Sequence, residues 1–132
     1  MDISTGIPAV DRINSYFWEM LRRDRAIIFQ RDGRLSAILS FVLVKDEQDA
    51  RALYSHPYEL PPLDNPQNEV VYIDKLMGDA WTRQMFREVQ ITLLAKFPKI
   101  RYGVWFRPTR TVDRMVIFNP HERKVNLHAQ LA

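Results

Sequence analysis

The segment from Arg34 to Val44 is the feature that most constrains how this chain can fold. It has the length of a strand and is rich in Leu, Ile, Val and Phe. Its apolar side chains alternate onto two faces, with Leu35, Ala37, Leu39, Phe41 and Leu43 on one and Ile38, Val42 and Val44 on the other. A strand that is apolar on both faces lies inside a sheet that is covered on both sides. The segment therefore predicts a central strand with other elements packed on each face of its sheet.

The residues just before this segment indicate its first partner. Ala26–Arg31 is a second β-rich run, and only Asp32 and Gly33 separate the two runs. Asp-Gly between two strands is a strong signal for a type I′ turn, which needs positive φ at both central residues. We expect an antiparallel hairpin with this turn. Gly33→Val should then cost on the order of 1 kcal/mol or more, because glycine tolerates positive φ best.

A helix is expected before the hairpin. Pro8 suits a first helical turn, and apolar residues follow at steps of three and four, which is the pattern of an amphipathic helix. We expect this helix to end near Asp24. Its predicted buried stripe comprises Val10, Ile13, Phe17, Met20 and Leu21.

After the hairpin, a long polar connection is expected over residues 45–68, with a short helix over 46–54. We then expect a strand over 69–76, a helix over 80–96 capped by Asp79, and strands over 100–106 and 114–119. The strand–helix–strand unit is long enough for a crossover between parallel strands. The 132 residues are thus predicted to form one α/β (α+β) domain with a mixed sheet, packed helices and a polar tail from about residue 121.

The composition narrows the functional classes. The chain has no cysteine, which excludes thiol catalysis, disulfide scaffolds and cysteine-ligated metals. Its histidines (His56, His121 and His128) lack the spacing of a metal site, so no metal is expected. The glycine-rich phosphate-binding motifs are also absent. No apolar run approaches the roughly 18 residues of a membrane span. Because the N-terminus also lacks the pattern of a secretory signal, we expect a cytoplasmic protein.

The charge balance is mildly basic. The chain has 19 Lys and Arg against 16 Asp and Glu, a net charge of +3, which is too small to indicate nucleic-acid binding. Arg107, Arg110 and Arg114 form a cluster that suits a phosphate or carboxylate partner, although a solvated surface is the simpler interpretation. A nucleic-acid interface would need exposed aromatic residues. We expect the three tryptophans to be core residues instead: Trp18, Trp81 and Trp105.

Asp74 is the first candidate functional residue. It lies inside an apolar strand, where alternation places it on one face with Val70, Tyr72 and Leu76. A carboxylate in that position is costly unless it is paired, and a carboxyl group in apolar surroundings suits a general base or a group that orients one. The alternatives are an ion pair with a nearby arginine, or exposure because the strand ends early. We expect Asp74 to be partly buried near the centre of the sheet.

The segment after Asp74 is the second candidate. The strand ends, Gly78 follows, and the next helix carries Thr82 and Arg83 in its first turns. Free N–H groups and the dipole at a helix N-terminus favour a phosphate group there. An ordinary connection between a strand and a helix is the alternative.

The order of elements resembles the GNAT acyltransferase fold, and three local patterns are similar to the toxin-activating lysine acyltransferases (the RTX toxin acyltransferases). The patterns together span residues 31–108. They are Arg31-Asp32-Gly33 followed by Ala37 and Ser40-Phe41, Tyr72-Ile73-Asp74 followed by Gly78-Asp79, and Lys96-Phe97-Pro98 followed by Arg107-Pro108. The usual glycine-rich GNAT signature at the start of the long helix is absent, since the corresponding stretch reads MGDAWTRQ.

The resemblance implies transfer of an acyl chain from acyl carrier protein, or from CoA, to an amine. Asp74 would correspond to the family's essential Asp. The family's catalytic His lies near the N-terminus, but residues 1–55 contain no histidine, so His56 is the candidate replacement.

The same resemblance gives the other candidate residues their roles. Gly78, Thr82 and Arg83 would line the phosphate end of the donor, and the Arg107, Arg110 and Arg114 cluster would meet an acidic carrier protein. No tightly bound cofactor is expected. The alternative is a catalytically degenerate interaction module of the same fold. A third hypothesis is a nucleic-acid-binding domain that would use arginines together with exposed Trp18, Trp81 or Trp105.

Overall fold

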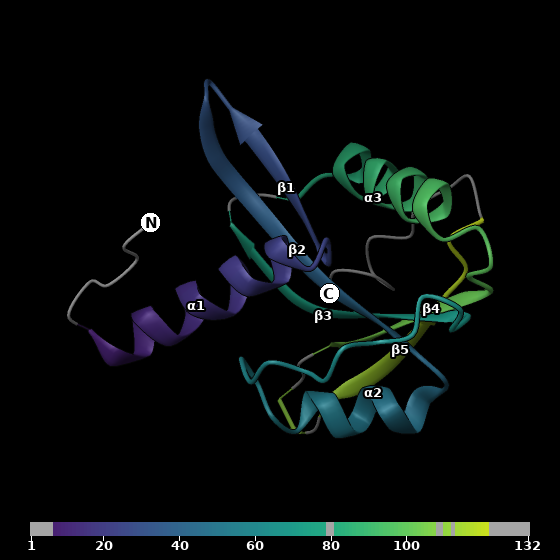
Figure 1. Ribbon diagram of the computed structural model, residues 1–132. Coiled ribbons are helices and arrows are strands. Elements are labelled where there is room, and N and C mark those ends of the chain that lie inside the picture. Colours follow the sequence, from purple (N-terminus) through teal and green to yellow (C-terminus); the bar gives the residue numbers. More distant parts are fainter. Residues whose placement is uncertain (1–6, 79–80, 108–109, 112, 122–132) are drawn as a thin grey trace.

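The computed structural model describes residues 7–78, 81–107, 110–111 and 113–121. Within those ranges the elements are α1 (Pro8–Arg22), β1 (Ala26–Arg31), β2 (Arg34–Val44), α2 (Glu47–Tyr54), β3 (Val70–Gly78), α3 (Arg83–Lys96), β4 (Tyr102–Arg107) and β5 (Arg114–Phe118). The strands form one sheet in the order β1-β2-β3-β4-β5 (Figure 1). Of the strands in the described residues, only β3 and β4 pair in parallel. The predicted mixed sheet with packed helices is therefore confirmed, whereas the polar tail lies almost entirely outside the described residues.

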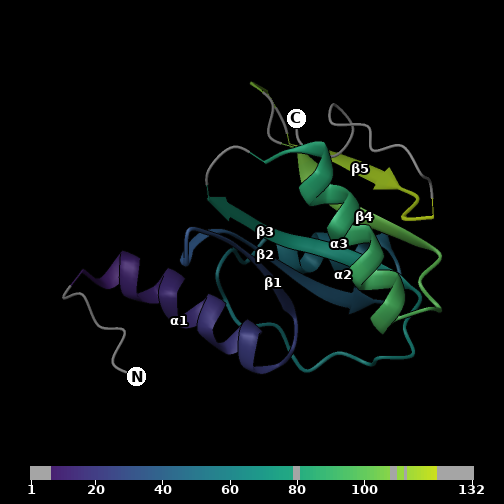
Figure 2. The ribbon, with the colours of Figure 1, turned by 90° about the horizontal axis from the view of Figure 1, so that it is seen from above.

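Helices cover both faces of the sheet. Figure 2, seen from above, shows α3 in front of the strands and α2 behind them. Leu39, Phe41 and Leu43 of β2 pack in the cluster that includes α3. Ile38, Val42 and Val44 pack in the cluster that includes α1 and α2. This division confirms that β2 is apolar on both faces because both faces are covered.

The hairpin has the predicted turn. Asp32 and Gly33 both have positive φ, 53° and 76° respectively, as a type I′ turn requires. The strands that flank them end and begin at the predicted residues. The local Asp-Gly signal was therefore sufficient to place this part of the chain.

Helix α1 differs from its predicted stripe. Val10 is 39% exposed, because the N-terminal part of the helix projects away from the sheet (Figure 1). The residues of α1 that are buried are Tyr16, Phe17 and Met20. The spacing identified two of these three and missed Tyr16.

The end of β3 and the start of α3 also differ from prediction. β3 continues to Gly78, where φ is 122°, and a Cβ atom at this position would lie 2.3 Å from the backbone oxygen of Ser36. Gly78 is therefore needed for close pairing with β2. Helix α3 begins at Arg83 rather than Ala80, and its N-cap is Thr82, whose side chain accepts a hydrogen bond from the Met85 N–H at 3.2 Å. Asp79, the predicted cap, lies outside the described residues.

The long connection between α2 and β3 is fixed to the edge of β2. The last pair of the β1–β2 ladder is Ala26 with Ser40, so β2 extends beyond its partner. There, Asp64 Oδ2 accepts a hydrogen bond from the Leu43 N–H at 2.8 Å, and Asn68 Nδ2 donates to the Leu43 oxygen at 3.1 Å. Arg25 binds the Asp64 carboxylate through two of its nitrogens. The connection thus continues the hydrogen bonding of the sheet with side chains.

Candidate active site

A β-bulge in β3 positions the candidate carboxylate. Ser40 pairs with Lys75 and Phe41 pairs with Ile73, so Asp74 is an extra residue without a partner on β2. An extra residue shifts the side-chain alternation of the strand that contains it. Leu76 accordingly packs in the α3 cluster, which corrects the prediction that it shares a face with Asp74. Asp74 and Lys75 both contact residues on the α1 and α2 side.

Asp74 is buried and hydrogen-bonded on that side of the sheet. Its side chain is 6% exposed, and its Oδ2 accepts a hydrogen bond from the Tyr16 hydroxyl of α1. That hydroxyl also lies 2.6 Å from Ser40 Oγ. Lys75 Nζ lies 3.3 Å from Asp74 Oδ1. The expected burial near the centre of the sheet is confirmed. The cationic partner is Lys75, whereas the alternative interpretation of Asp74 had named an arginine.

Three tyrosines surround this carboxylate as neutral phenols. Burial, followed by the negative charge of Asp74, raises the pKa of Tyr16, of Tyr72 and of Tyr58. Tyr16 donates a hydrogen bond to the carboxylate, and Tyr72 lies close enough for its phenol pKa to respond to the same charge. Near neutral pH these phenols therefore keep their protons and do not act as bases.

Strands β3 and β4 separate next to Asp74. They pair through only three residues of each strand, the last being Tyr72 with Val104. Beyond that pair β3 continues to Gly78 and β4 to Arg107, and the two strands diverge (Figure 1). On the α3 side of the divergence lies a small pocket whose one polar lining residue is Gln90. Asp74 thus lies two residues past the last parallel pair, in the middle of β3, just beyond the part of the strand that pairs with β4.

His56 is not brought to Asp74. Its side chain is 65% exposed, and its Nδ1 lies 3.4 Å from Glu59 of the same loop. Tyr58, two residues later, does reach the site, where its ring packs edge-on against Tyr16 with 5.6 Å between centroids. The loop therefore folds back over the site, but the side chain that it places there is Tyr58.

The predicted donor residues lie at the other end of the diverging strand. The close approach that Gly78 permits is to Ser36 and Ala37 of β2. Thr82 uses its hydroxyl to cap α3, and Arg83 is exposed as the first residue of that helix. Thr82 and Arg83 thus remain adjacent to a helix N-terminus, whereas Gly78 has a structural role in the sheet.

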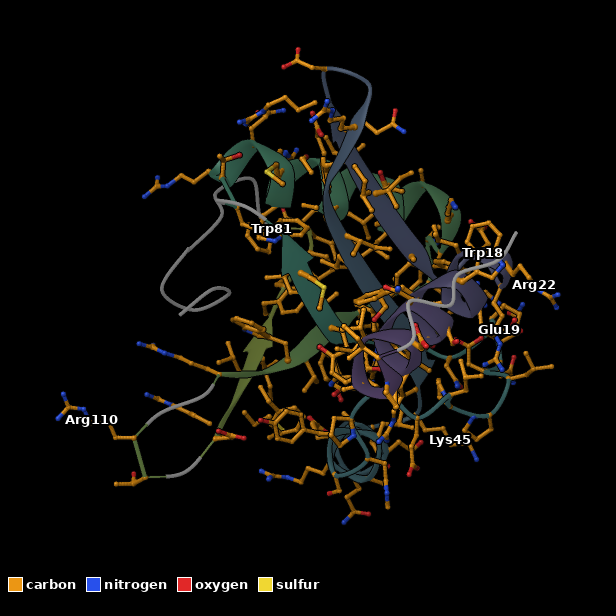
Figure 3. The ribbon with its side chains drawn as sticks, turned by 90° about the vertical axis from the view of Figure 1, so that its left-hand side faces the viewer. Trp18, Glu19, Arg22, Lys45, Trp81 and Arg110 are labelled. Atoms are coloured by element: carbon orange, nitrogen blue, oxygen red, sulfur yellow. The ribbon has the colours of Figure 1, made fainter. Side chains whose placement is uncertain are left out.

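The arginine cluster is placed together at one end of the sheet. Arg107 and Arg114 are partners in the β4–β5 ladder, and Arg110 is exposed in the segment that joins these strands. Figure 3 shows Arg110 extending from the molecule, far from Trp18. Trp18 is 42% exposed, which contradicts the prediction that it is a core residue, whereas Trp105 is 9% exposed and Trp81 packs against Phe29 and Phe86.

Comparisons with known proteins add no family assignment, because no family model, curated protein or solved structure matches this chain. Among the described residues, no three His, Cys, Asp or Glu side chains are arranged to hold a metal ion. In the same part of the chain, no helix is both long and apolar enough to cross a membrane.

The sequence interpretation missed Tyr16, Tyr58 and Lys75, which lie at this site. Tyr16 carried a usable signal, because it precedes Met20 by four positions and so lies on the same helical face. Lys75 carried none, because it reaches the face of Asp74 only through the bulge.

Proposed function

We propose that this protein is a GNAT-like acyltransferase, related to the RTX toxin acyltransferases. It would move an acyl group from the phosphopantetheine thioester of CoA or acyl carrier protein to an amine. The observation that carries the proposal is the buried Asp74 at the point where the parallel strands β3 and β4 separate. In open sheets with parallel strands, ligands bind in the crevice at the carboxyl ends of the strands.

The donor would lie along the free edge of β3. Among the described residues, β3 has no ladder partner on its β4 side past Tyr72, so backbone groups of its later part can pair with an extended, amide-bearing chain such as the pantetheine arm. Helix α3 begins at Arg83, shortly after β3 ends. Its N-terminal N–H groups and dipole favour the phosphate end of the donor, and Arg83 can add a charge-assisted hydrogen bond.

Asp74 would act as the general base for the acceptor amine. The amine nitrogen attacks the thioester carbonyl carbon, the C–N bond forms and the C–S bond breaks. Asp74 accepts the proton that the amine releases, and that proton then passes to the leaving thiolate. Tyr16 keeps the carboxylate in place, and the raised pKa of its phenol keeps it a hydrogen-bond donor throughout.

A second candidate is an interaction module that keeps the fold and has lost the chemistry. Two observations favour it: Lys75 already occupies the Asp74 carboxylate, and His56 points away from it. Such a module would use the arginines of the β4–β5 end to bind an acidic carrier protein without turnover.

Native mass spectrometry with CoA, acyl-CoA and acyl-loaded carrier protein separates these candidates. We expect saturable donor binding that Arg83→Ala weakens about tenfold, and that Arg34→Ala, at the exposed hairpin tip, leaves unchanged. Asp74→Asn should keep donor binding and lose acyl transfer to a lysine peptide. Carrier binding without transfer by the wild type would favour the interaction module. If neither CoA nor carrier protein binds, the acyltransferase proposal is wrong.

A further inference from the structure

The ammonium group of Lys75 lies in a box made by one carboxylate and two aromatic rings. Its Nζ is 3.3 Å from Asp74 Oδ1, 5.8 Å from the centroid of the Tyr54 ring and 5.4 Å from that of Tyr58. The Lys75 side chain is 13% exposed. A carboxylate together with aromatic rings within about 6 Å is an environment that recognises a cationic amine. We refer to Asp74, Tyr54 and Tyr58 as the ammonium box.

The walls of the ammonium box are held by contacts that do not involve Lys75. The Tyr54 ring stacks on Phe106 with 4.3 Å between centroids, and its hydroxyl donates to Asp113. Tyr58 packs edge-on against Tyr16, whose hydroxyl in turn holds Asp74. The box should therefore keep its shape when the lysine side chain leaves it.

The direct polar contacts of Lys75 are long. Its hydrogen bonds to the Asp74 backbone oxygen and to Oδ1 are both 3.3 Å, beyond the usual range for N–H···O bonds. A lysine side chain is also a flexible stem with a single point charge. It reaches the box because the bulge turns it to the face of Asp74, next to the divergence of β3 and β4.

We infer that the ammonium box is the subsite for the acceptor amine, and that Lys75 occupies it as an internal substitute for the substrate. This inference rests on the proposed function and names its acceptor class: an unbranched primary alkylamine, such as a lysine side chain. Lys75 must swing out before the substrate amine can enter. The protein with Lys75 in the box is therefore blocked by its own side chain.

Calorimetric titration with n-butylammonium tests the inference without any thioester donor. Lys75→Ala should bind n-butylammonium saturably and at least tenfold more tightly than the wild type. The neutral analogue n-butanol should not bind, and the double variant Lys75→Ala/Asp74→Asn should lose at least tenfold in affinity. Lys45→Ala, which removes an exposed lysine (Figure 3), is the matched control and should behave as the wild type does. Lys75→Ala binding no tighter than the wild type, or binding n-butanol equally well, would overturn the inference.

A measurement on the wild type covers the case in which Lys75→Ala does not fold. Pulse acetylation with an N-hydroxysuccinimide ester, followed by peptide mass spectrometry, reports how often Lys75 leaves the box. We expect Lys75 to react within about tenfold of the rate of Lys45, because local opening exposes it. Protection of more than about a hundredfold would mean a permanent structural contact and would overturn the inference.

The two proposals can fail separately. A protein that transfers acyl groups, but whose Lys75→Ala variant gains no affinity for n-butylammonium, retains its proposed function and lacks the ammonium subsite. A protein that binds the amine in this variant, but never binds a thioester donor, retains the subsite and loses the acyltransferase assignment.

Discussion

Asp64 and Asp74 are buried to almost the same extent, with side chains 8% and 6% exposed, but they are paired in different ways. Asp64 receives a two-nitrogen contact from Arg25, with a shortest distance of 2.8 Å, and the Leu43 N–H at 2.8 Å. The Arg25 guanidinium also lies 4.8 Å from the centroid of Phe97. Asp74 receives one phenol and one lysine contact at 3.3 Å.

The difference separates a carboxylate that builds the fold from one to which we have assigned a chemical role as a proposal. A forked guanidinium matches both carboxylate oxygens and loses little freedom when it binds them. Asp64 therefore holds the long connection against β2. Asp74 lies beside the divergence of β3 and β4, and its partner is a lysine with longer contacts. Burial alone would not have distinguished the two residues.

Substitution of Asp64 should have the largest effect on stability. Asp64→Ala leaves Arg25 buried without its partner and the Leu43 N–H unbonded, so we expect it to lower the free energy of unfolding by about 3–5 kcal/mol in urea denaturation. The double variant Arg25→Ala/Asp64→Ala should cost less than the sum of the two single changes, because the charges are removed together. A loss below about 1 kcal/mol for Asp64→Ala would mean that the ion pair contributes little.

Tyr16→Phe tests the hydrogen bond that holds Asp74. It removes the phenol donor from a buried carboxylate, and we expect a loss of about 1–3 kcal/mol in the same denaturation experiment. Tyr54→Phe is the matched control, because its hydroxyl donates to the exposed Asp113. The control should cost less than about 1 kcal/mol, and an equal loss in both variants would argue against a special role for Tyr16.

Asp74→Asn should have a smaller effect on stability. The amide oxygen can still accept from Tyr16, and the flexible Lys75 can turn toward solvent, so we expect a loss of about 1 kcal/mol with the fold intact by circular dichroism. If the proposed function is correct, acyl transfer should fall by about a hundredfold or more. A stability loss as large as that of Asp64→Ala would instead make Asp74 a structural residue.

Alkaline pH should destabilise the fold through its tyrosines, three of which surround Asp74. The pKa of every tyrosine in the chain is raised, that of Tyr54 to about 12. Unfolded tyrosine ionises near pH 10, so the folded state binds these protons more tightly. Stability should be unchanged below about pH 10 and should fall as the pH rises toward 12. Tyrosinate absorbance should appear together with the loss of ellipticity; absorbance that rises near pH 10 in a fully folded protein would contradict this expectation.

The parts of the fold that depend on neighbouring residues could be predicted from the sequence. Asp32-Gly33 specified the hairpin, and the apolar alternation of residues 34–44 specified a strand covered on both faces. The burial of Asp74 also followed from its apolar neighbours. Each of these signals is carried by a few adjacent side chains.

The parts that depend on distant residues could not be predicted. Tyr16 meets Asp74 across 58 positions, and Arg25 meets Asp64 across 39. The bulge at Asp74 left no pattern in the sequence, yet it reversed the face of Leu76 and brought Lys75 to the site. The start of α3 was missed because Asp79 and Thr82 are both good caps, and local preference does not choose between them.

Asp64 and Asn68 also cover backbone groups on an unpaired edge of β2, where another copy of the chain could otherwise add a strand. A stretch of strand that extends past its neighbour offers free N–H and C=O groups, and an apolar one is a template for unwanted strand addition. β2 extends past β1 with the residues Phe41–Val44. The Phe41 N–H is taken by the Arg25 oxygen, and both backbone groups of Leu43 are taken by side chains. Substitution of Asp64 would therefore free the Leu43 N–H at the edge of β2 as well as weaken the fold. We expect Asp64 variants to aggregate at concentrations where the wild type stays in solution.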